Sequence, residues 1–547
     1  MLPFIHKLKL VFSFLISYPL AGLLKRVPDS RPDLKNLFII STSTFYLVGL
    51  FDLWDGVRTL AIASAGIYSI AKYMRTSPFM PWVGFTFLMG HMSISHIARQ
   101  VTNSPSSVDI TGAQMVLLMK LSGFCWNVAD GQLPDDQVSE YQKERRLIEL
   151  PSIMDYAGYV LFFPSLFAGP AFDYTDYRKW IDTTMFDLPA QVDPSKKPPV
   201  RKKRKIPRSG TPATLKAASG LGWIALFMIL SGYYPITYLT SPSYMDHGFF
   251  HRVWILHMVG FTARLKYYGV WCLTEGACIL AGLGYNGVDP VTGKVSWNRL
   301  QNINPWGVET AQNTRAYLGN WNINTNNWLR NYVYLRVTPV GKKPGFRASL
   351  LTFSTSALWH GFYPGYYMSF ILASFIQTVA KSKYTYERAT AGLEECYDRL
   401  TSMIDYRRYF RAFFLDATSG APTSNKVYYD VLSLFVTQIG MSFVVTPFLV
   451  LEFSGSVQVW ARVYFYTIVG TALSMAFFAS PAKQILRKQL EARQGKGGAK
   501  LTRTLSQDSL TGREPVLGVS ADPQREIDEA MEEIKAEVEA RQRSKAT

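Results

Sequence analysis

Cysteine is scarce in this sequence, with four residues among 547. Cys125, Cys272, Cys278 and Cys396 follow neither the spacing of a metal site nor that of a disulfide framework. Three of them lie in apolar stretches, where cysteine usually acts as a small buried hydrophobic residue. The sequence therefore gives no support for a zinc or redox function. It also lacks a repeat of fixed period, which argues against a repeat architecture.

Charge is missing from long stretches of the chain, although charged residues make up 18% of it. The mean hydropathy of +0.03 conceals this separation of apolar from charged segments. A helix needs roughly 20 mainly apolar residues to cross a bilayer. Such stretches occur at residues 8–24, 36–54, 57–75, 78–97, 110–128, 153–172, 214–238, 249–284, 347–380, 427–452 and 457–480. The sequence predicts an all-α polytopic transmembrane helical bundle of about 10–11 membrane segments, with residues 249–284 forming two passes or one pass plus a re-entrant piece.

No small-residue cleavage site follows the first apolar stretch, which indicates an uncleaved anchor or interfacial helix rather than a signal peptide. The net charge of +18 is concentrated in a linker whose basic residues are Lys196, Lys197, Arg201, Lys202, Lys203, Arg204, Lys205 and Arg208. The positive-inside rule places residues 186–212 in the cytosol, in contact with solvent or anionic lipid. A nuclear-localisation or nucleic-acid patch is the less favoured alternative because the neighbouring segments are apolar.

Polar composition marks two further segments outside the predicted membrane helices. Residues 383–425 are charged and tyrosine-rich, and they are expected to form an extramembrane or interfacial helix and loop. Residues 484–547 are expected to form a largely disordered cytosolic tail with a solvent-exposed helix near 523–543. The predicted division is therefore a membrane-embedded domain at 1–483, including the cytosolic linker, followed by this tail.

His360 is the titratable side chain in the apolar run from about 348 to 380. Ionisable groups inside membranes are costly, so they indicate function by default. Pro364 cannot donate an N–H to the carbonyl of His360, so the sequence predicts a helix that kinks there, with Gly361 and Gly365 easing the bend. The alternative is a neutral histidine that hydrogen-bonds to a neighbouring helix.

Asparagine gathers in a second stretch, residues 321–336. Asn322 lies between Trp321 and Ile323, where a buried amide must find partners. Asn324 and Asn326 are interpreted as turn and cap residues, because asparagine readily ends helices and holds turns. By itself this stretch is equally consistent with a helix cap.

Two further polar clusters lie in apolar surroundings. Glu275 falls within a predicted membrane helix, where it would act in the site or pair with Arg264 or Lys266. In residues 163–177, the Gly169-Pro170 step is expected to end a helix and release an acidic, aromatic loop.

Together these stretches resemble the membrane-bound O-acyltransferase family, in its glycerophospholipid branch and with most likeness to fungal broad-specificity lysophospholipid acyltransferases. The resemblance runs in order from about residue 40 to 480 and excludes the basic linker and the tail. The matching residues are Trp126-Asn127 and Asp130-Gly131, Gly169-Pro170 with Asp173-Tyr174, Lys266-Tyr267-Tyr268 with Glu275-Gly276-Ala277, Trp321-Asn322 with Trp328-Leu329, and Trp359-His360-Gly361 with Pro364-Gly365-Tyr366. Any one of these motifs alone would be weak evidence for the family, whereas their occurrence in order is strong evidence.

The resemblance implies an endoplasmic reticulum enzyme with a central reaction chamber, in which His360 and Asn322 form the catalytic pair. It implies acyl-CoA as co-substrate, no cofactor or metal, and a 1-acyl lysophospholipid as acceptor. Nucleic acid is not an expected partner, and the oligomeric state is left open. The expected substrate-binding residues are Trp321, Trp328, Arg330, Arg336, Trp359, Tyr366, Tyr268 and Glu275, with Lys342 and Lys343 as further contacts for the phosphates of coenzyme A.

The chemistry of these side chains fits acyl transfer, which needs a base for the hydroxyl proton and a donor for the developing oxyanion. Three alternatives stay open at this point. The acceptor could be a sterol, a diacylglycerol or a protein; the chain could be a proton-coupled transporter using His360 and Glu275; and Ser356, one helical turn before His360, could form an acyl-enzyme.

Overall fold

The computed structural model describes residues 2–102, 109–188, 198–200, 204–290, 292–338, 346–380, 414, 423–482, 484–485 and 488–489. Over these ranges the chain is helical, and its only β-type pairings are isolated bridges at Val200–Pro207 and Val288–Val295. The all-α prediction is therefore confirmed. Most of the basic linker, the segment at 383–425 and the C-terminal tail lie outside the described residues.

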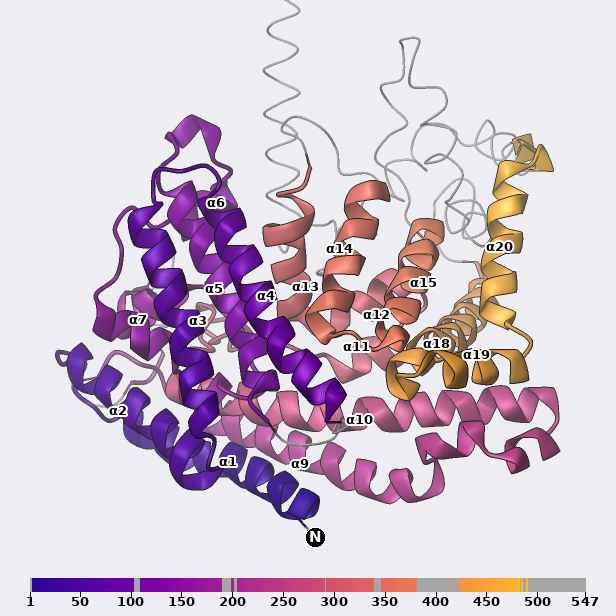
Figure 1. Cartoon of the computed structure of the whole chain (residues 1–547), viewed down its shortest axis with the longest axis horizontal. Coiled ribbons are helices and arrows are strands. Elements are labelled where there is room, and N and C mark those ends of the chain that lie inside the picture. The colour runs from indigo at the N-terminus through magenta and orange to yellow at the C-terminus, as the bar shows by residue number, and fades with distance from the viewer. Residues whose placement is uncertain are drawn as a thin grey trace, which may run out of the picture.

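The N-terminal half is a group of helices in which α3, α4 and α6 pack against α5, and α2 packs against α7 (Figure 1). These helices are α1 (Leu2–Leu24), α2 (Pro32–Thr44) with a π-helical end (Phe45–Leu50), α3 (Trp54–Tyr73), α4 (Met80–Val101), α5 (Thr111–Asp130), α6 (Glu140–Arg145), α7 (Ile153–Val160) and α8 (Tyr174–Ile181). Nearly every side chain of α5 is buried, including that of Lys120. The apolar stretches at 36–128 therefore correspond closely to the observed helices.

Two long helices, α9 (Gly210–Tyr233) and α10 (Phe249–Ala281), run side by side along the lower edge of Figure 1. Glycine allows them to approach closely, since a Cβ on Gly220 would lie 2.9 Å from the carbonyl oxygen of Gly269. The prediction of two passes, or a re-entrant piece, at 249–284 is wrong. Its charged and glycine residues are contact points on one continuous helix rather than breaks.

Among the described helices, two are long and apolar enough to cross a membrane by length and composition: the run Gly210–Thr240 and α18 (Lys426–Val450). Other predicted spans are interrupted. The stretch at 153–172 contains only α7 and a short 3-10 turn at Phe163–Ser165, because Pro164 starts a new turn. The stretch at 457–480 divides between α19 (Phe453–Arg462) and α20 (Tyr466–Ala479).

The apolar run at 347–380 forms a helical hairpin instead of one kinked helix. α14 (Phe346–His360) ends at His360, and α15 (Pro364–Ala380) returns alongside it (Figure 1). The rings of Phe353 and Phe370, one from each helix, lie 6.4 Å apart. Gly361 has a φ of +125°, which side-chain-bearing residues rarely adopt. Pro364 then begins α15, where its missing N–H costs nothing. The helix break at the histidine is thus sharper than predicted.

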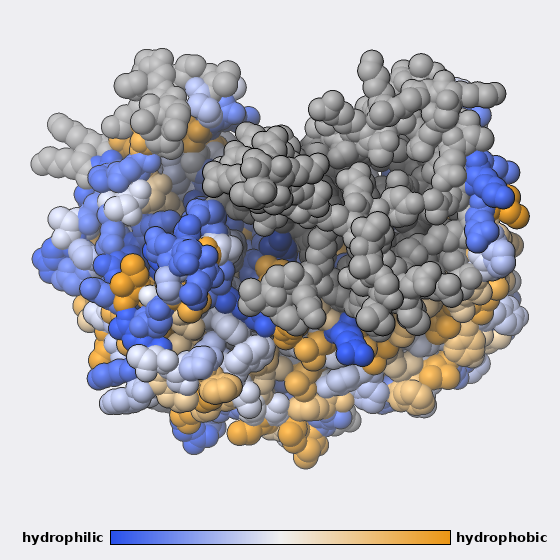
Figure 2. All heavy atoms as spheres, turned by 90° about the horizontal axis from the view of Figure 1, so that it is seen from above, coloured by the Kyte–Doolittle hydropathy of each residue, from blue (hydrophilic) through white to orange (hydrophobic). Residues whose placement is uncertain are grey.

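Short helices connect α10 to this hairpin: α11 (Pro305–Glu309), α12 (Thr314–Asn320), α13 (Ile323–Leu329) and a π-helical turn (Arg330–Tyr334). On the far side, α18 packs against α15, and the N–H of Gly365 donates to the carbonyl of Leu451 at 2.8 Å. Seen from above, hydrophilic side chains gather over the N-terminal helices, while apolar side chains line the lower edge of the view (Figure 2).

Candidate active site

His360 lies at the tip of the α14–α15 hairpin, where its half-buried imidazole is surrounded by aromatic rings. Ring centroids lie 4.7 Å away for Trp359, 5.6 Å for Tyr366, 5.2 Å for Phe370 and 4.8 Å for Phe448. Phe448 comes from α18, so three helices build this apolar wall. Such a wall limits the access of water to the imidazole.

The imidazole lines a small pocket at the tip of the hairpin. The lining residues are His96, Arg99, His360, Gly361, Phe362, Tyr363 and Tyr366. The pocket combines apolar walls with a few polar groups, which is typical of ligand sites. The structure thus places His360 and Tyr366 in the same pocket, together with His96 and Arg99 from α4.

His96 was missed by the sequence reasoning, although the same rule that selected His360 applies to it. It is a buried histidine within the predicted span at 78–97. Its Nε2 lies 3.0 Å from the carbonyl oxygen of Trp359, beside the backbone of His360. His96 therefore holds the end of α14 in place, and Nδ1 faces Gly361, where a Cβ would lie only 3.1 Å away.

Asn322 precedes α13 with φ 45° and ψ 52°, a left-handed conformation that asparagine tolerates better than most residues. Its Oδ1 accepts a hydrogen bond from the hydroxyl of Thr325 at 2.9 Å, and it makes no side-chain bond to the helix N-terminus. Within the part of the chain that the structure describes, the amide Nδ2 has no hydrogen-bond partner. That nitrogen remains a potential donor for a ligand oxygen.

The neighbouring Asn324 and Asn326 use their amides locally, but both lie inside α13 rather than at a turn or helix cap as predicted. Nδ2 of Asn324 donates to the side chain of Asn302 at 3.2 Å and lies near two carbonyls of the same loop. Nδ2 of Asn326 donates to the carbonyls of Leu318 at 2.6 Å and Trp321 at 2.7 Å. Of these three asparagines, Asn322 is the one with amide protons to spare.

Two buried tryptophans connect the helix of Asn322 to the helix of His360. The rings of Trp328 in α13 and Trp359 in α14 lie 6.1 Å apart. Trp328 donates its indole N–H to Ser122 at 2.8 Å, and Trp359 donates to the carbonyl of Met115 at 3.1 Å. Because both donors are engaged by α5, these side chains contribute packing surface rather than hydrogen bonds to a substrate.

Comparison with known proteins bears on this arrangement. The sequence profile of the membrane-bound O-acyltransferase family matches residues 100–393. The chain is 42% identical over 487 residues to a lysophospholipid acyltransferase of Schizosaccharomyces pombe, covering 89% of each chain. It is 40% identical to a lysophospholipid acyltransferase of Saccharomyces cerevisiae, over 87% of this chain and 75% of the relative. Lysophospholipid acyltransferase 1 of Arabidopsis thaliana is 30% identical over 87% of this chain and 94% of the relative.

The chain belongs to the membrane-bound O-acyltransferase family. It is accordingly a membrane protein, and the likeness stated from its motifs is confirmed. Within the described residues, no group of three or more His, Cys, Asp or Glu side chains could hold a metal ion. The described cysteines Cys125, Cys272 and Cys278 are free and buried.

Trp321 sits in an aromatic cluster on α10 of this acyltransferase. Its ring lies 5.6 Å from Tyr267, 5.9 Å from Tyr268 and 5.1 Å from Trp271. The hydroxyl of Tyr268 donates to Glu309 at 2.5 Å, so this predicted substrate contact already has a protein partner. The cluster fixes the chain immediately before Asn322.

Glu275 is not paired with Arg264 or Lys266, so the predicted ion pair is wrong in its partner. The carboxylate is 1% exposed and lies 2.8 Å from Nζ of Lys216 on α9. Arg264 pairs with Glu309 at 2.8 Å. The two charged residues of α10 thus pair with residues of different elements. These partners could not be predicted from the sequence alone.

Glu275→Gln is expected to destabilise this acyltransferase without disabling it. Losing the carboxylate leaves Lys216 without its buried partner, a change of about 1–3 kcal/mol in the free energy of unfolding. The midpoint temperature of thermal unfolding of the detergent-solubilised protein should fall by several degrees. Turnover should stay within threefold of wild type. Asp55→Asn, which removes a pair between exposed side chains on α3, is the matched control. A tenfold loss of turnover at an unchanged unfolding midpoint would instead support the prediction that Glu275 binds substrate.

The predicted arginine contacts for coenzyme A have protein partners. Arg336 forms a two-bond ion pair with Asp130 and lies over the ring of Trp126 at 4.4 Å. Nη1 of Arg330 donates to Asn331 at 2.9 Å. Lys342 and Lys343 lie outside the described residues. Arg336 therefore fastens the π-helical turn after α13 to α5, and contacts with coenzyme A stay a prediction for these side chains.

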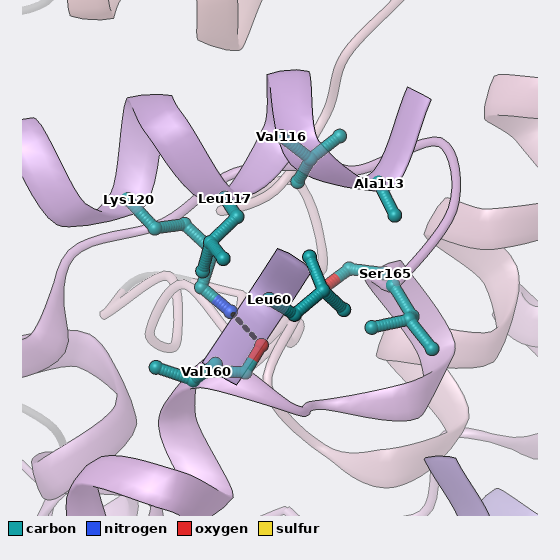
Figure 3. Close-up of a pocket in the computed structure, with 8 residues that line it drawn as sticks. Leu60, Ala113, Val116, Leu117, Lys120, Val160 and Ser165 are labelled. Atoms are coloured by element: carbon teal, nitrogen blue, oxygen red, sulfur yellow. Dashed lines mark hydrogen bonds between the residues drawn. The ribbon is translucent and has the colours of Figure 1, made fainter. Parts of the chain in front are cut away.

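A second small pocket lies away from His360, between α3, α5 and the turn after α7 (Figure 3). Lys120 reaches into it and donates to the carbonyls of Tyr159 and Val160, the latter at 3.5 Å, as the dashed line in Figure 3 shows. The rings of Tyr159 and Phe172 lie 4.4 Å from its ammonium. Carbonyls and ring faces thus hold this buried charge, which joins α5 to the α7 segment.

Proposed function

We propose that this protein transfers an acyl chain from acyl-CoA to the free hydroxyl of a 1-acyl lysophospholipid, forming a diacyl glycerophospholipid in phospholipid synthesis and remodelling. The observation that carries the proposal is the extended likeness to lysophospholipid acyltransferases, together with an imidazole that opens into a pocket. We place the enzyme in the endoplasmic reticulum membrane, with residues 186–212 and 484–547 on the cytosolic side and outside the chemistry.

In the proposed reaction, His360 is the general base. Its imidazole takes the acceptor's hydroxyl proton as the oxygen attacks the thioester carbonyl carbon. The carbon–sulfur bond then breaks, and the thiolate of coenzyme A receives the proton from the imidazolium, so atoms and charges balance. Aromatic rings around His360 keep water from competing with the acceptor.

Asn322 is proposed to stabilise the oxyanion that forms on the thioester carbonyl. Its amide nitrogen has protons to donate, unlike those of Asn324 and Asn326. A neutral amide can donate to a developing negative charge without the desolvation cost of a cation. The left-handed backbone at Asn322 is a local strain of the kind that gathers at functional sites.

Direct transfer is favoured over an acyl-enzyme at Ser356. Ser356 is a buried residue of α14, in a helix where serine commonly bonds to a backbone carbonyl of its own turn. Direct transfer requires both substrates to be bound together, so initial-rate plots should intersect. Parallel lines, or an acyl adduct at Ser356 in a mass spectrum, would favour the acyl-enzyme instead.

The deciding experiment mixes purified protein with oleoyl-CoA and measures free thiol with and without lysophosphatidylcholine. Thiol release that depends on the lysolipid, with diacyl product in equal amount, is expected. Thiol release that depends on a sterol or diacylglycerol instead would move the enzyme to another branch of the family. The absence of any acceptor-dependent thiol release would favour the transporter alternative.

A further inference from the structure

The acceptor's own chemistry restricts where its phosphate can bind. In a 1-acyl lysophospholipid, the reacting hydroxyl oxygen and the phosphorus are separated by four single bonds, a reach of about 5 Å at ~1.5 Å per bond. If His360 removes the hydroxyl proton, as proposed above, the phosphate must lie within a short distance of that imidazole. The group that binds it must therefore line the same pocket.

Arg99 is the permanently cationic side chain among the residues that line the His360 pocket. It lies in the last turn of α4, three residues after His96, and its side chain is 27% exposed. A guanidinium is the group that proteins favour for phosphate recognition, because its N–H donors match two phosphate oxygens at once. Its side chain lines the pocket and is partly exposed, so the charge lies at the pocket rather than deep in the core.

A carboxylate near Arg99 does not prevent this role. The distance from Nε of Arg99 to the carboxylate of Asp109 is 3.9 Å, which is an ion pair too long for a hydrogen bond. A guanidinium has five N–H donors, so it can face Asp109 and a second anion together. Asp109 itself is engaged at the start of α5, where it accepts from the backbone N–H of Thr111 at 2.9 Å.

Tyr363 supplies a second, independent sign of a polar ligand in this pocket. Its hydroxyl is shielded from solvent and has no hydrogen-bond partner among the described residues. Buried polar groups rarely stay unpaired, so such an oxygen points to a bound group or water. Because Tyr363 and Arg99 line the same pocket, a phosphate bound there could accept hydrogen bonds from the hydroxyl of Tyr363 and the N–H groups of Arg99.

We propose that Arg99 and the hydroxyl of Tyr363 bind the phosphodiester of the lysophospholipid acceptor beside His360. This inference rests on the proposed function, because it needs a phospholipid acceptor. The shared chemistry is a phosphate oxyanion, which coenzyme A could also supply. Substrate-specific KM values distinguish the two sources.

The test compares Arg99→Gln with wild type in purified, full-length protein. Loss of one charged hydrogen-bonding partner is expected to raise the KM for 1-oleoyl lysophosphatidylcholine about tenfold to a hundredfold. The KM for oleoyl-CoA should stay within twofold. An ether lysophosphocholine without the reacting hydroxyl should inhibit wild type competitively against the lysolipid, with an inhibition constant that rises equally in Arg99→Gln.

Matched variants separate recognition from folding. Arg99→Lys keeps the charge and should give an intermediate KM, while Tyr363→Phe should raise the lysolipid KM by a smaller factor. Arg58→Gln, a change at an exposed arginine on α3, should leave both KM values unchanged. An increase confined to the oleoyl-CoA KM would assign the site to coenzyme A and overturn the proposal. Unchanged KM and inhibition constants in an active Arg99→Gln enzyme would overturn it too, whereas an inactive wild type would instead contradict the proposed function.

Discussion

Turnover of His360→Ala is expected to fall by a factor of about 10²–10⁴, the contribution of a positioned general base. The imidazole ends α14 and lines the pocket, so its removal takes the proposed base away from the site. Within the pocket, His96 is the other imidazole, and its Nε2 is engaged by the carbonyl of Trp359. Rates of thiol release at saturating oleoyl-CoA and lysolipid measure the effect.

His251→Ala is the matched control for this variant, because that histidine is exposed on α10 and does not line the His360 pocket. Both variants should reach wild-type levels in membranes and elute as wild type in size-exclusion chromatography. Turnover of His360→Ala within tenfold of wild type, with folding intact, would exclude it as the base.

Asn322→Ala is expected to lower turnover by about 10²-fold or more, the scale of losing one oxyanion donor. The KM values should change little, because the lost interaction forms as charge develops on the thioester oxygen. Single-turnover rates with oleoyl-CoA and lysolipid would locate the loss in the chemical step.

Asn324→Ala and Asn326→Ala are the internal controls for Asn322. Their amides hold the chain around α13 through local carbonyl contacts, so their loss should lower stability more than the rate of the chemical step. If Asn324→Ala proved more damaging to turnover than Asn322→Ala, the assignment of the oxyanion donor would be wrong.

Sequence patterns located most helices because burial and membrane length act on contiguous residues. The runs that became α3, α4, α5 and α9 are uninterrupted, and their boundaries agree within a few residues with those expected. Prediction was weaker where backbone geometry decides. The turn after His360 depends on the positive φ of Gly361 and on the start of a new helix at Pro364. From the sequence, these residues predicted only a kink.

Ion-pair partners that lie far apart in the sequence could not be predicted from local sequence patterns. Glu275 was recognised as a charge in an apolar helix and Arg336 was expected to contact coenzyme A, but their partners Lys216 and Asp130 lie far away along the chain. His360 could be selected from its apolar run as a candidate site residue, because burying an ionisable group is costly. Which charges neutralise each other depends on how helices face one another, and that information appears only after packing.

The α14–α15 hairpin also affects how the whole chain is threaded through the bilayer. A single crossing would deliver the chain to the opposite side, whereas a chain that turns back at His360 leaves on the side where it entered. This holds whether each arm spans the membrane or only dips into it, since the number of crossings is even in both cases. Counting residues 347–380 as one pass would therefore assign every later segment to the wrong side of the membrane. Glycosylation or protease-protection maps should be interpreted with the hairpin counted as an even number of crossings.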